Sequence, residues 1–227
     1  MKLHKKIIIT GTLELLTGLH IGDSKDNVEI GGVDNPIIRR KDNNQPYVPG
    51  SSIKGKMRSL LEVALGENHN TDFRGYVTPD GKTLAQLFGS AANDGTPARL
   101  LIRDANLTTS SAQLLSESEF TDMPFTEVKF ENTINRITGV ALNPRQTERV
   151  PAGSVFDLNF VINIVTADGN ETEARTTETN FVKLLRAGIR LLEDDYLGGS
   201  GSRGYGQVKI TLDEPVSKTV ETYLNPA

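Results

Sequence analysis

One short segment of the chain combines glycine, basic side chains and the expected start of a helix. Residues 49–58 read Pro-Gly-Ser-Ser-Ile-Lys-Gly-Lys-Met-Arg. Gly50 to Lys56 matches G-x-x-x-x-G-K, a loop that holds nucleotide phosphates, but Met57 stands where that loop needs Ser or Thr to hold Mg²⁺. Residues 47–49 are also too short for the strand that leads into such a loop. We therefore favour a phosphate-binding helix start over a nucleotide-hydrolysing P-loop.

The same region is basic within an acidic protein. The chain has 25 Lys plus Arg against 29 Asp plus Glu, a net charge of −4, which excludes the wrapping of nucleic acid by bulk charge. Residues 36–60 nevertheless hold six Lys or Arg and one Asp. Helix-start N–H groups and nearby cations bind phosphate, so this region predicts a phosphate-binding edge; a solvated basic face is the alternative. The edge is expected from Lys54, Lys56 and Arg58, with Ser51 or Ser52 as the N-cap of the helix.

A second candidate segment is rich in glycine. Residues 198–206, called the glycine loop below, contain five glycines in nine residues. Such a stretch allows the backbone to approach a ligand closely, while Arg203 adds charge and Tyr205 adds a stacking face. A flexible connector is the alternative reading.

Two further candidates are single polar side chains. Asp34 follows Gly31-Gly32-Val33, and on its own this is ordinary turn chemistry. Because Asp34 precedes the basic segment, its carboxylate could also hold a divalent cation or help activate a hydroxyl beside bound phosphates. His20 is isolated, and a hydrogen-bonded residue at the end of a strand is the more typical role for it.

Residues 127–150 read as a hairpin arm with mixed charge and exposed β-branched side chains. An exposed apolar tip, at Ile134 or Ile137, could wedge between bases. An irregular loop that covers the sheet is the alternative for an insertion of this size.

Hydrophobic periodicity supplies the elements that would position these groups. Strands are expected at residues 6–19, 99–107, 156–165 and 205–212, with a bulge at Gly11 in the first, and helices from the Ser51–Ser52 cap to Gly66 and at residues 179–194. The order strand, helix, strand, strand, helix, strand predicts an α+β, ferredoxin-like (RRM-like) βαββαβ core. One domain, 1–227, is expected, with its core at about 1–65, 98–107 and 155–213. The insertions at about 66–97 and 108–154 are expected to form a lid or helical subdomain and a thumb hairpin. Residues 111–131 are acidic and expected to be exposed.

Composition excludes several classes of site. The chain has no Cys, which excludes disulfides, Cys-ligated zinc, iron–sulfur clusters and thiol nucleophiles, and 3 His make a His-rich zinc site unexpected. No uninterrupted apolar stretch is long enough to cross a bilayer. We expect a soluble cytoplasmic protein without a membrane partner.

Taken together, these segments resemble the repeating backbone subunit of type III-A CRISPR–Cas (Csm) interference complexes, a member of the RAMP superfamily. The resemblance spans nearly the whole chain in order, and the matched positions lack none of the groups that the family needs. The matching segments are residues 18–22 (GLHIG), 33–37 (VDNPI), 47–56 (YVPGSSIKGK), 87–89 (LFG), 131–132 (EN), 134–136 (INR), 148–153 (ERVPAG) and 197–206 (LGGSGSRGYG).

The resemblance implies a subunit that stacks in copies along a CRISPR guide RNA, beside other Csm subunits, and cuts complementary target RNA at regular intervals. Asp34 would be the catalytic residue, with a divalent metal, Mg or Mn, that Asp34 itself would hold. A thumb around residues 132–138 would displace a base pair of the guide–target duplex. The implied RNA-binding residues are His20, Ser51, Ser52, Lys54, Lys56, Arg58, Asn132, Ile134, Arg136, Thr138, Gly199, Ser200, Gly201, Ser202 and Arg203.

Two readings compete with this one. The first is a structural subunit that coats RNA without cutting it, in which Asp34 is only a turn residue. The second, less favoured, is a P-loop nucleotidase.

Overall fold

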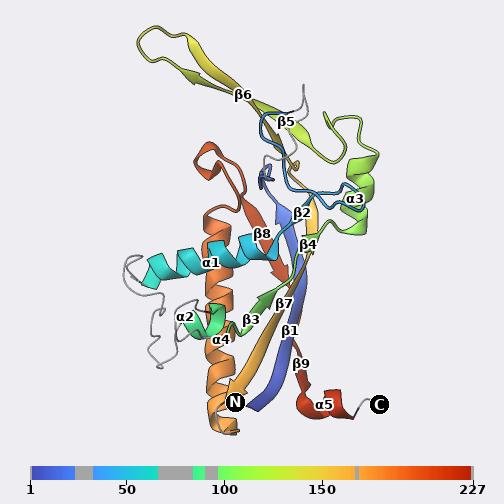
Figure 1. Cartoon of the computed structure of the whole chain (residues 1–227), viewed down its shortest axis with the longest axis vertical. Helices are drawn as coiled ribbons and strands as arrows, with labels where there is room; N and C mark the ends of the chain where they lie inside the picture. The colour runs from blue at the N-terminus through green and yellow to red at the C-terminus, as the bar shows by residue number, and fades with distance from the viewer. Residues whose placement is uncertain (1, 24–32, 66–83, 90–96, 167–168, 226–227) are drawn as a thin grey trace.

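The computed structural model describes residues 2–23, 33–65, 84–89, 97–166 and 169–225. Gly31, Gly32, Gly66 and most of the first predicted insertion lie outside these residues. The described chain mixes helices and strands (Figure 1). The strands are β1 (Lys2–Leu15), β2 (Tyr47–Val48), β3 (Leu100–Ile102), β4 (Ala105–Asn106), β5 (Glu127–Ile134), β6 (Ala141–Arg149), β7 (Val155–Thr166), β8 (Val208–Leu212) and β9 (Val216–Thr219). The helices are α1 (Gly50–Leu65), α2 (Leu84–Phe88), α3 (Thr109–Ser116), α4 (Glu171–Asp194) and α5 (Val220–Leu224), with a 3-10 turn at Gly201–Arg203.

The main sheet is antiparallel, with strand order β3-β7-β1-β8 and with β9 paired to the other end of β1. The predicted alternation in β1 is confirmed, since Ile7, Ile9, Leu13 and Leu15 are all buried. The predicted bulge at Gly11 is wrong: Gly11 pairs in regular register with both neighbouring strands. A Cβ at Gly11 would lie 2.2 Å from the carbonyl oxygen of Thr211, so glycine is needed there for close strand approach.

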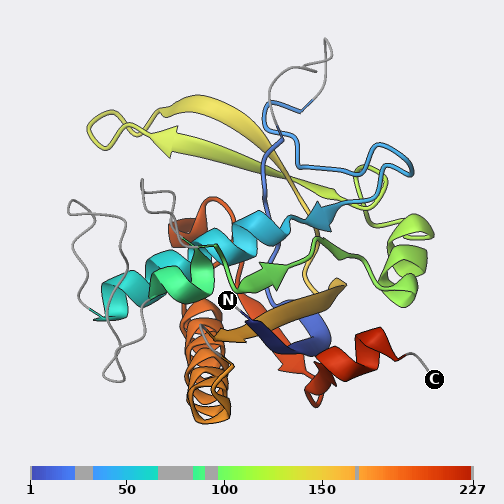
Figure 2. The same ribbon diagram turned by 60° about the horizontal axis from the view of Figure 1, so that its bottom comes forward.

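Helices α1 and α4 pack against one another beside the sheet, as Figure 2 also shows. At their crossing, a Cβ on Gly188 would lie 3.2 Å from the side chain of Leu61. Helix α4 begins at Glu171, eight residues before the predicted start, and Asn170 caps it through the N–H groups of Thr172 and Glu173. Its first half buries small or polar residues such as Ala174 and Thr177, so its apolar stripe is weak in the sequence.

Three other predicted segments differ from the observed elements. The strand expected at 99–107 is divided into β3 and β4, and β4 pairs with β2 instead of joining the main sheet. The acidic segment expected to be exposed contains α3, which buries Ser111 and Leu115. The last strand begins at Val208, three residues later than predicted, and it is followed by β9 and α5, which periodicity did not indicate.

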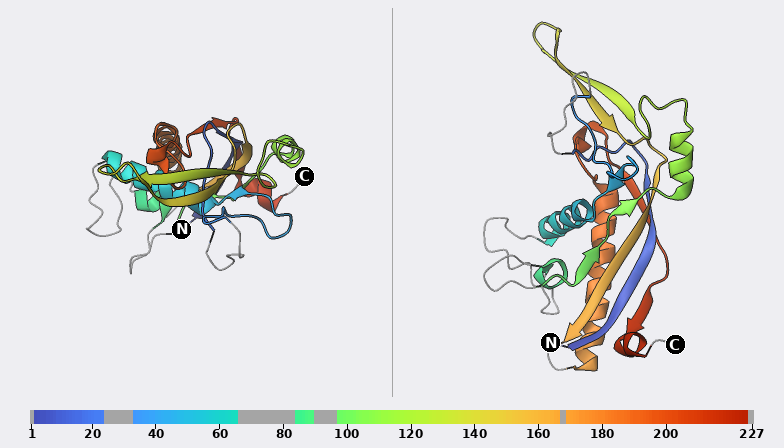
Figure 3. Two further views of the ribbon diagram at one scale, coloured as in Figure 1. Left: turned by 90° about the horizontal axis from the view of Figure 1, so that it is seen from above. Right: turned by 45° about the vertical axis from the view of Figure 1, so that its right-hand side comes forward.

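Strands β5 and β6 form a two-stranded hairpin that projects from the rest of the molecule (Figures 1 and 3). Glu127 pairs with Arg149 at its attached end, and Ile134 pairs with Ala141 near its free end. We call the attached end, from Thr126 to Glu131 and from Arg145 to Arg149, the hairpin base, and residues 134–141 the hairpin tip. The hairpin extends to the same side of the molecule as α1, with the glycine loop between them (Figure 1). Among the described helices, none is both long and apolar enough to span a bilayer.

Candidate nucleic-acid interface

Asp34 lies against the hairpin base. Its side chain is exposed, and one carboxylate oxygen, Oδ2, accepts a 2.8 Å hydrogen bond from the N–H of Gln146 in β6. The next residue, Asn35, forms backbone hydrogen bonds with Gln146 and Glu148 on the same strand. These contacts attach the backbone around Asp34 to β6. The hydrogen bond from Gln146 uses only one of the two carboxylate oxygens of Asp34.

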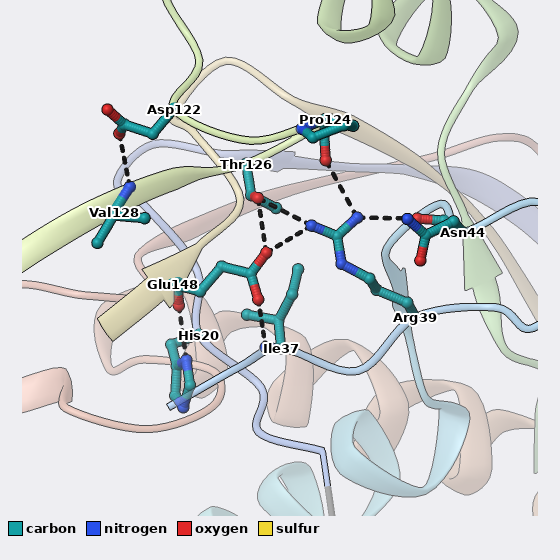
Figure 4. A network of polar contacts seen from close by, with 9 residues as sticks. All are labelled: His20, Ile37, Arg39, Asn44, Asp122, Pro124, Thr126, Val128 and Glu148. Atoms are coloured by element: carbon teal, nitrogen blue, oxygen red, sulfur yellow. Dashed lines mark hydrogen bonds and ion pairs between the residues drawn. The ribbon is translucent and has the colours of Figure 1, made fainter. Parts of the chain in front are cut away.

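A buried carboxylate holds the rest of this loop. The side chain of Glu148 is 3% exposed; one oxygen accepts from the N–H of Ile37 at 2.8 Å, and the other accepts from Thr126 Oγ1 at 2.7 Å and from Arg39 Nη2 at 2.5 Å (Figure 4). The Arg39 guanidinium, 15% exposed, also donates to the carbonyls of Asn44 and Pro124. We call Glu148, Thr126, Ile37 and Arg39 the Glu148 network.

His20 joins the hairpin base to the glycine loop. Its ring Nδ1 lies 2.7 Å from the carbonyl oxygen of Glu148 (Figure 4), and because a carbonyl only accepts, Nδ1 carries the proton. The backbone carbonyl of His20 accepts from the N–H of Gly199 at 2.9 Å. The expected hydrogen bond of His20 is present, but the strand expected at 6–19 ends at Leu15, so His20 lies in the loop beyond β1 and not at a strand end. His20 lies between two of the predicted sites.

Several glycines of the glycine loop approach the protein itself. Gly198 has φ +77°, and a Cβ there would lie 2.4 Å from the carbonyl of His20. A Cβ on Gly201 would lie 2.0 Å from the ring of Tyr196, and one on Gly206 would lie 2.0 Å from the carbonyl of Leu197. Gly204, at φ +83°, faces open space. Three of the five glycines, Gly198, Gly201 and Gly206, are therefore needed because the protein itself lies where a side chain would be. Close approach to a ligand does not explain these three positions.

The basic residues of α1 divide into two directions. The Lys56 ammonium lies 2.8 Å from Asp195 and 3.6 Å from the ring centre of Tyr196, which connects α1 to the glycine loop. Lys54 instead donates to the carbonyl of Leu100 in β3, and burial, followed by the charge of Arg58, lowers the pKa of Lys54. Arg58 donates to the carbonyl of Gly89 and pairs with Glu62. The described structure thus places Lys56 beside the glycine loop, while Lys54 and Arg58 face the α2–β3 side of the helix.

The start of α1 differs from the prediction. The helix begins at Gly50, so the predicted cap residues Ser51 and Ser52 lie within its first turn. The N–H of Gly50 is bound instead by the carboxylate of Asp104, at 2.8 Å. A Cβ on Gly50 would lie 2.2 Å from the carbonyl of Ile102, so the strand end approaches the helix too closely for any side chain. Because Gly50 to Lys56 is helical, the segment does not form a phosphate loop, and the P-loop interpretation is wrong.

Tyr205 connects the glycine loop to the hairpin base. Its ring is 1% exposed, with the Lys129 ammonium 4.4 Å and the Arg149 guanidinium 5.1 Å from the ring centre. Burial, and then the neighbouring Glu131 carboxylate, raise the pKa of Tyr205 to about 12. Although burial opposes the charged form of Glu131, Tyr205 and two arginines lower its pKa. These arginines, Arg145 and Arg203, lie 3.2 and 3.8 Å from the Glu131 carboxylate.

The hairpin tip has the opposite character. Ile134 is 64% exposed and Ile137 is 95% exposed, and Asn132, Arg136 and Thr138 are exposed as well. The turn satisfies its own backbone, because Asn135 Oδ1 accepts from the N–H groups of Ile137 and Thr138. The tip therefore presents apolar side chains on a turn that needs no partner to hold its shape.

Comparisons with known proteins agree with this architecture. A model of the RAMP superfamily matches residues 12–209. The chain belongs to the RAMP superfamily. It is 41% identical over 242 aligned residues to a Methanothermobacter thermautotrophicus protein named CRISPR system Cms endoribonuclease Csm3, with 100% of this chain and 92% of that protein covered.

Two solved structures share this RAMP fold. A Methanopyrus kandleri Csm3 crystal structure matches with a TM-score of 0.66 and 26% identity, covering 99% of this chain and 80% of that one. A Csm3-Csm4 subcomplex in the type III-A CRISPR-Cas interference complex matches with a TM-score of 0.60 and 28% identity, covering 99% of this chain and 86% of that one. The resemblance to the repeating subunit of Csm complexes, seen in the sequence, is thereby confirmed.

Whether a divalent ion fits at Asp34 depends on the donor groups that the described residues place around it. Within the described residues, no three His, Asp or Glu side chains gather as a metal cage. Mg²⁺ is commonly held by one or two carboxylates together with waters and substrate phosphates. One exposed carboxylate, such as that of Asp34, whose second oxygen accepts no hydrogen bond from the described residues, fits an ion that shares its ligands with bound RNA.

Sequence reasoning assigned no role to three residues that organise this site. Glu148 carries the contacts of the Asp34 loop, Glu131 gathers two arginines, and Tyr196 lies between Lys56 and Gly201. Alternation along β6 could have indicated the first, since Glu148 lies two residues before buried Val150 and therefore on the same strand face. Glu131 lies in one of the segments that carry the family resemblance, but no local pattern indicates its role, and nothing local marks Tyr196.

Proposed function

We propose that this chain is a CRISPR RNA-binding backbone subunit of a type III-A (Csm) complex that cleaves complementary target RNA. In this proposal copies of the chain stack along the guide RNA, beside other Csm subunits in the cytoplasm, and each copy cuts the target once, which gives regular intervals. Support comes from the full-length relative named as an endoribonuclease and from the matching Csm3-Csm4 subcomplex.

We also propose a division of the chain into a core and two insertions. The elements β1-α1-β3-β7-α4-β8, with strand order β3-β7-β1-β8, would form one ferredoxin-like core. The β5–β6 hairpin would be the thumb, and α2 would belong to a lid.

The observation that carries the proposal is the position of Asp34. Its exposed carboxylate is fixed by Gln146 to the base of a projecting hairpin whose tip carries exposed Ile134 and Ile137. An inserted apolar tip unstacks bases, and an unstacked nucleotide can reach the in-line geometry for attack by its own 2′-hydroxyl. The bond from O2′ to phosphorus forms and the bond from phosphorus to O5′ breaks, which gives a 2′,3′-cyclic phosphate and a 5′-hydroxyl. The 2′-hydroxyl loses its proton, and the leaving O5′ takes one from water.

Asp34 would act on this reaction from its fixed loop. The carboxylate oxygen that does not bind Gln146 would accept or orient the 2′-hydroxyl proton. General bases fill this role in other enzymes. We propose Asp34 as the residue that holds a divalent ion, Mg or Mn, which when bound would neutralise charge on the reacting phosphate. The backbone anchors at Asn35 and Ile37 would keep the carboxylate in place.

RNA would be held by groups from α1, the glycine loop and the hairpin. Arg203 lies within the glycine loop, and Lys56 lies over the ring of Tyr196, which packs against Gly201 of that loop. A lysine that gives one N–H to a carbonyl, as Lys54 does, keeps two for phosphate. The proposed RNA-binding set is His20, Ser51, Ser52, Lys54, Lys56, Arg58, Asn132, Ile134, Arg136, Thr138, Gly199, Ser200, Gly201, Ser202 and Arg203.

One observation favours a second candidate function. The Asp34 carboxylate accepts a hydrogen bond from the N–H of Gln146. This bond would give Asp34 a structural role even in a subunit that does not cut RNA. In that case the chain would coat guide RNA without cutting the target.

Replacement of Asp34 by Asn separates the two functions. Asn keeps an oxygen that can accept from Gln146 but removes the charge, so we expect assembly and RNA binding to persist while target cleavage falls by about a hundredfold or more. Cleavage by the reconstituted complex would be followed with end-labelled target RNA at several Mg²⁺ and Mn²⁺ concentrations.

The matched control is Asp122→Asn. Asp122 is also exposed, and its Oδ2 accepts from a hairpin N–H, that of Val128, at 2.8 Å. It should leave cleavage unchanged. Undiminished cutting by Asp34→Asn would contradict the proposed catalytic role and leave the structural subunit as the function.

A further inference from the structure

Three segments that are distant in the sequence meet at the side chain of Glu148. Ile37 and Arg39 come from the loop that follows Asp34, Thr126 begins the hairpin, and Glu148 ends it (Figure 4). In the loop, alternate residues face β6: Asn35 through its backbone, Ile37 through its N–H and Arg39 through its guanidinium. The Asp34 loop is therefore attached to the hairpin as an extended segment with a fixed register.

The contacts require a carboxylate. Glu148 offers two oxygens, of which Oε2 serves Ile37 and Oε1 serves both Thr126 and Arg39. A glutamine has one accepting oxygen and an NH₂ group in the other place. That NH₂ group would face a donor, so either the Ile37 anchor or the Arg39 and Thr126 anchor would be lost.

The Glu148 and Thr126 side chains of the network are buried and separate from the exposed site. Thr126 is fully buried and Glu148 is 3% exposed, whereas Asp34 is exposed. Neither buried side chain is placed to contact RNA. Their effect on any reaction at Asp34 must pass through the backbone of residues 34–39.

We infer that Glu148 is a positioning residue, which, with Arg39 and Thr126, sets the distance between the Asp34 carboxylate and the hairpin. This inference rests on the proposed function, in which Asp34 cuts a nucleotide that the hairpin displaces. Misplacement of a reacting group by about 1 Å can cost about a hundredfold in rate. A loosened loop should therefore slow the chemical step without weakening the hold on RNA.

The sharpest test removes one hydroxyl from the network. Thr126→Val keeps the shape of the side chain but removes the group that donates to Glu148 and accepts from Arg39, while Thr126→Ser restores it. In the reconstituted complex with saturating target RNA, we expect Thr126→Val to cut about tenfold or more slowly and Thr126→Ser to recover most of the rate. Guide RNA and target RNA dissociation constants should change less than twofold. Glu148→Gln should reproduce the loss.

The control is Glu127→Gln. Glu127 also pairs with an arginine across the hairpin, Arg149 at 2.5 Å, but its carboxylate has no hydrogen bond to the Asp34 loop among the described contacts. It should cut at the wild-type rate. A wild-type rate in Thr126→Val and Glu148→Gln would overturn the inference, as would lost guide RNA binding in Thr126→Val, because the network would then hold the fold as a whole.

Asp34→Asn, measured beside these variants, separates the two proposals. If Asp34→Asn cuts normally, the proposed function fails and the positioning role fails with it. If Asp34→Asn is inactive while both network variants cut normally, only the positioning role fails.

Discussion

The two ends of the β5–β6 hairpin differ in where their side chains find partners. At the base, Glu148 is buried, as is Tyr205 of the glycine loop, which packs against the base, and the charges around both are paired within the chain. At the tip, Ile134 and Ile137 are exposed on a turn that satisfies its own backbone. Buried polar contacts thus fix the direction in which the hairpin projects, and exposed apolar side chains leave its tip free to contact something else.

The largest expected difference is in the free energy of unfolding, when a side chain packed against the base and a side chain at the tip are each truncated to alanine. Tyr205→Ala removes a 1% exposed aromatic side chain, and we expect a loss of about 3–5 kcal/mol in the free energy of unfolding. Ile137→Ala removes a 95% exposed side chain and should change it by less than about 0.5 kcal/mol. Urea denaturation followed by circular dichroism measures both. Equal losses would show that the tip is packed in solution.

Target cleavage should depend on the exposed tip, although the free energy of unfolding does not. Ile134→Ser should leave the free energy of unfolding unchanged but slow target cleavage about tenfold, because a polar side chain is a poor wedge between bases. Val63→Ser on α1 is the control, since Val63 is β-branched and 64% exposed, as Ile134 is. Cleavage that is insensitive to Ile134→Ser would remove the tip from the proposed mechanism.

The base should also respond to acid. The pKa of Glu131 is lowered in the folded chain, so its charged form stabilises the fold above the ordinary Glu pKa of about 4.3, and this stabilisation is lost as the pH falls through the lowered value. The melting temperature of the wild type should therefore exceed that of Glu131→Gln at pH 7, and the difference should shrink below about pH 4. Exposed Glu119 provides the control, Glu119→Gln. A difference that grew in acid would contradict the assigned contacts.

The smallest expected effect concerns salt. Arg203→Ala and Lys56→Ala should each reduce the slope of log affinity against log salt by about one unit if each contacts one phosphate. Lys218→Ala, on exposed β9 far from the hairpin (Figure 1), should not. Filter binding of guide RNA between 50 and 300 mM salt, about the range in which counterion release dominates, gives the slopes. Unchanged slopes would mean that these cations serve only Glu131 and Tyr196.

The sequence predicted those parts of the fold whose periodicity is strong. β7 was found within one residue at each end because Phe156, Leu158, Phe160, Ile162 and Ile164 alternate without interruption. The first half of α4 was missed because small and polar residues fill its buried face. The bulge expected at Gly11 was wrong because a glycine in a strand also serves close approach by a neighbouring strand, which local sequence does not distinguish.

The candidate site was predictable as a set of segments but not as a geometry. Asp34 and the hairpin were both singled out, yet their contact depends on pairing between residues more than a hundred positions apart, such as Asp34 and Gln146. Likewise, the Gly50 N–H is bound by Asp104, a carboxylate 54 residues away, and not by a neighbouring serine. Local propensity carries no information on such partners. The one local signal at Glu148 is its place two residues before Val150, which puts both side chains on the same strand face.

The lack of space for a side chain at Gly50 has a consequence for sequence searches that use the phosphate-binding loop pattern. Its glycine is required by the carbonyl of Ile102, which lies where a side chain would be. Packing therefore accounts for the first of the three fixed positions of G-x-x-x-x-G-K, while Gly55, where a Cβ would meet nothing within 4 Å, and Lys56 complete the pattern. A scan that omits the Ser or Thr after the lysine will therefore return a false match in this chain unless the first glycine is also required to lie outside a helix.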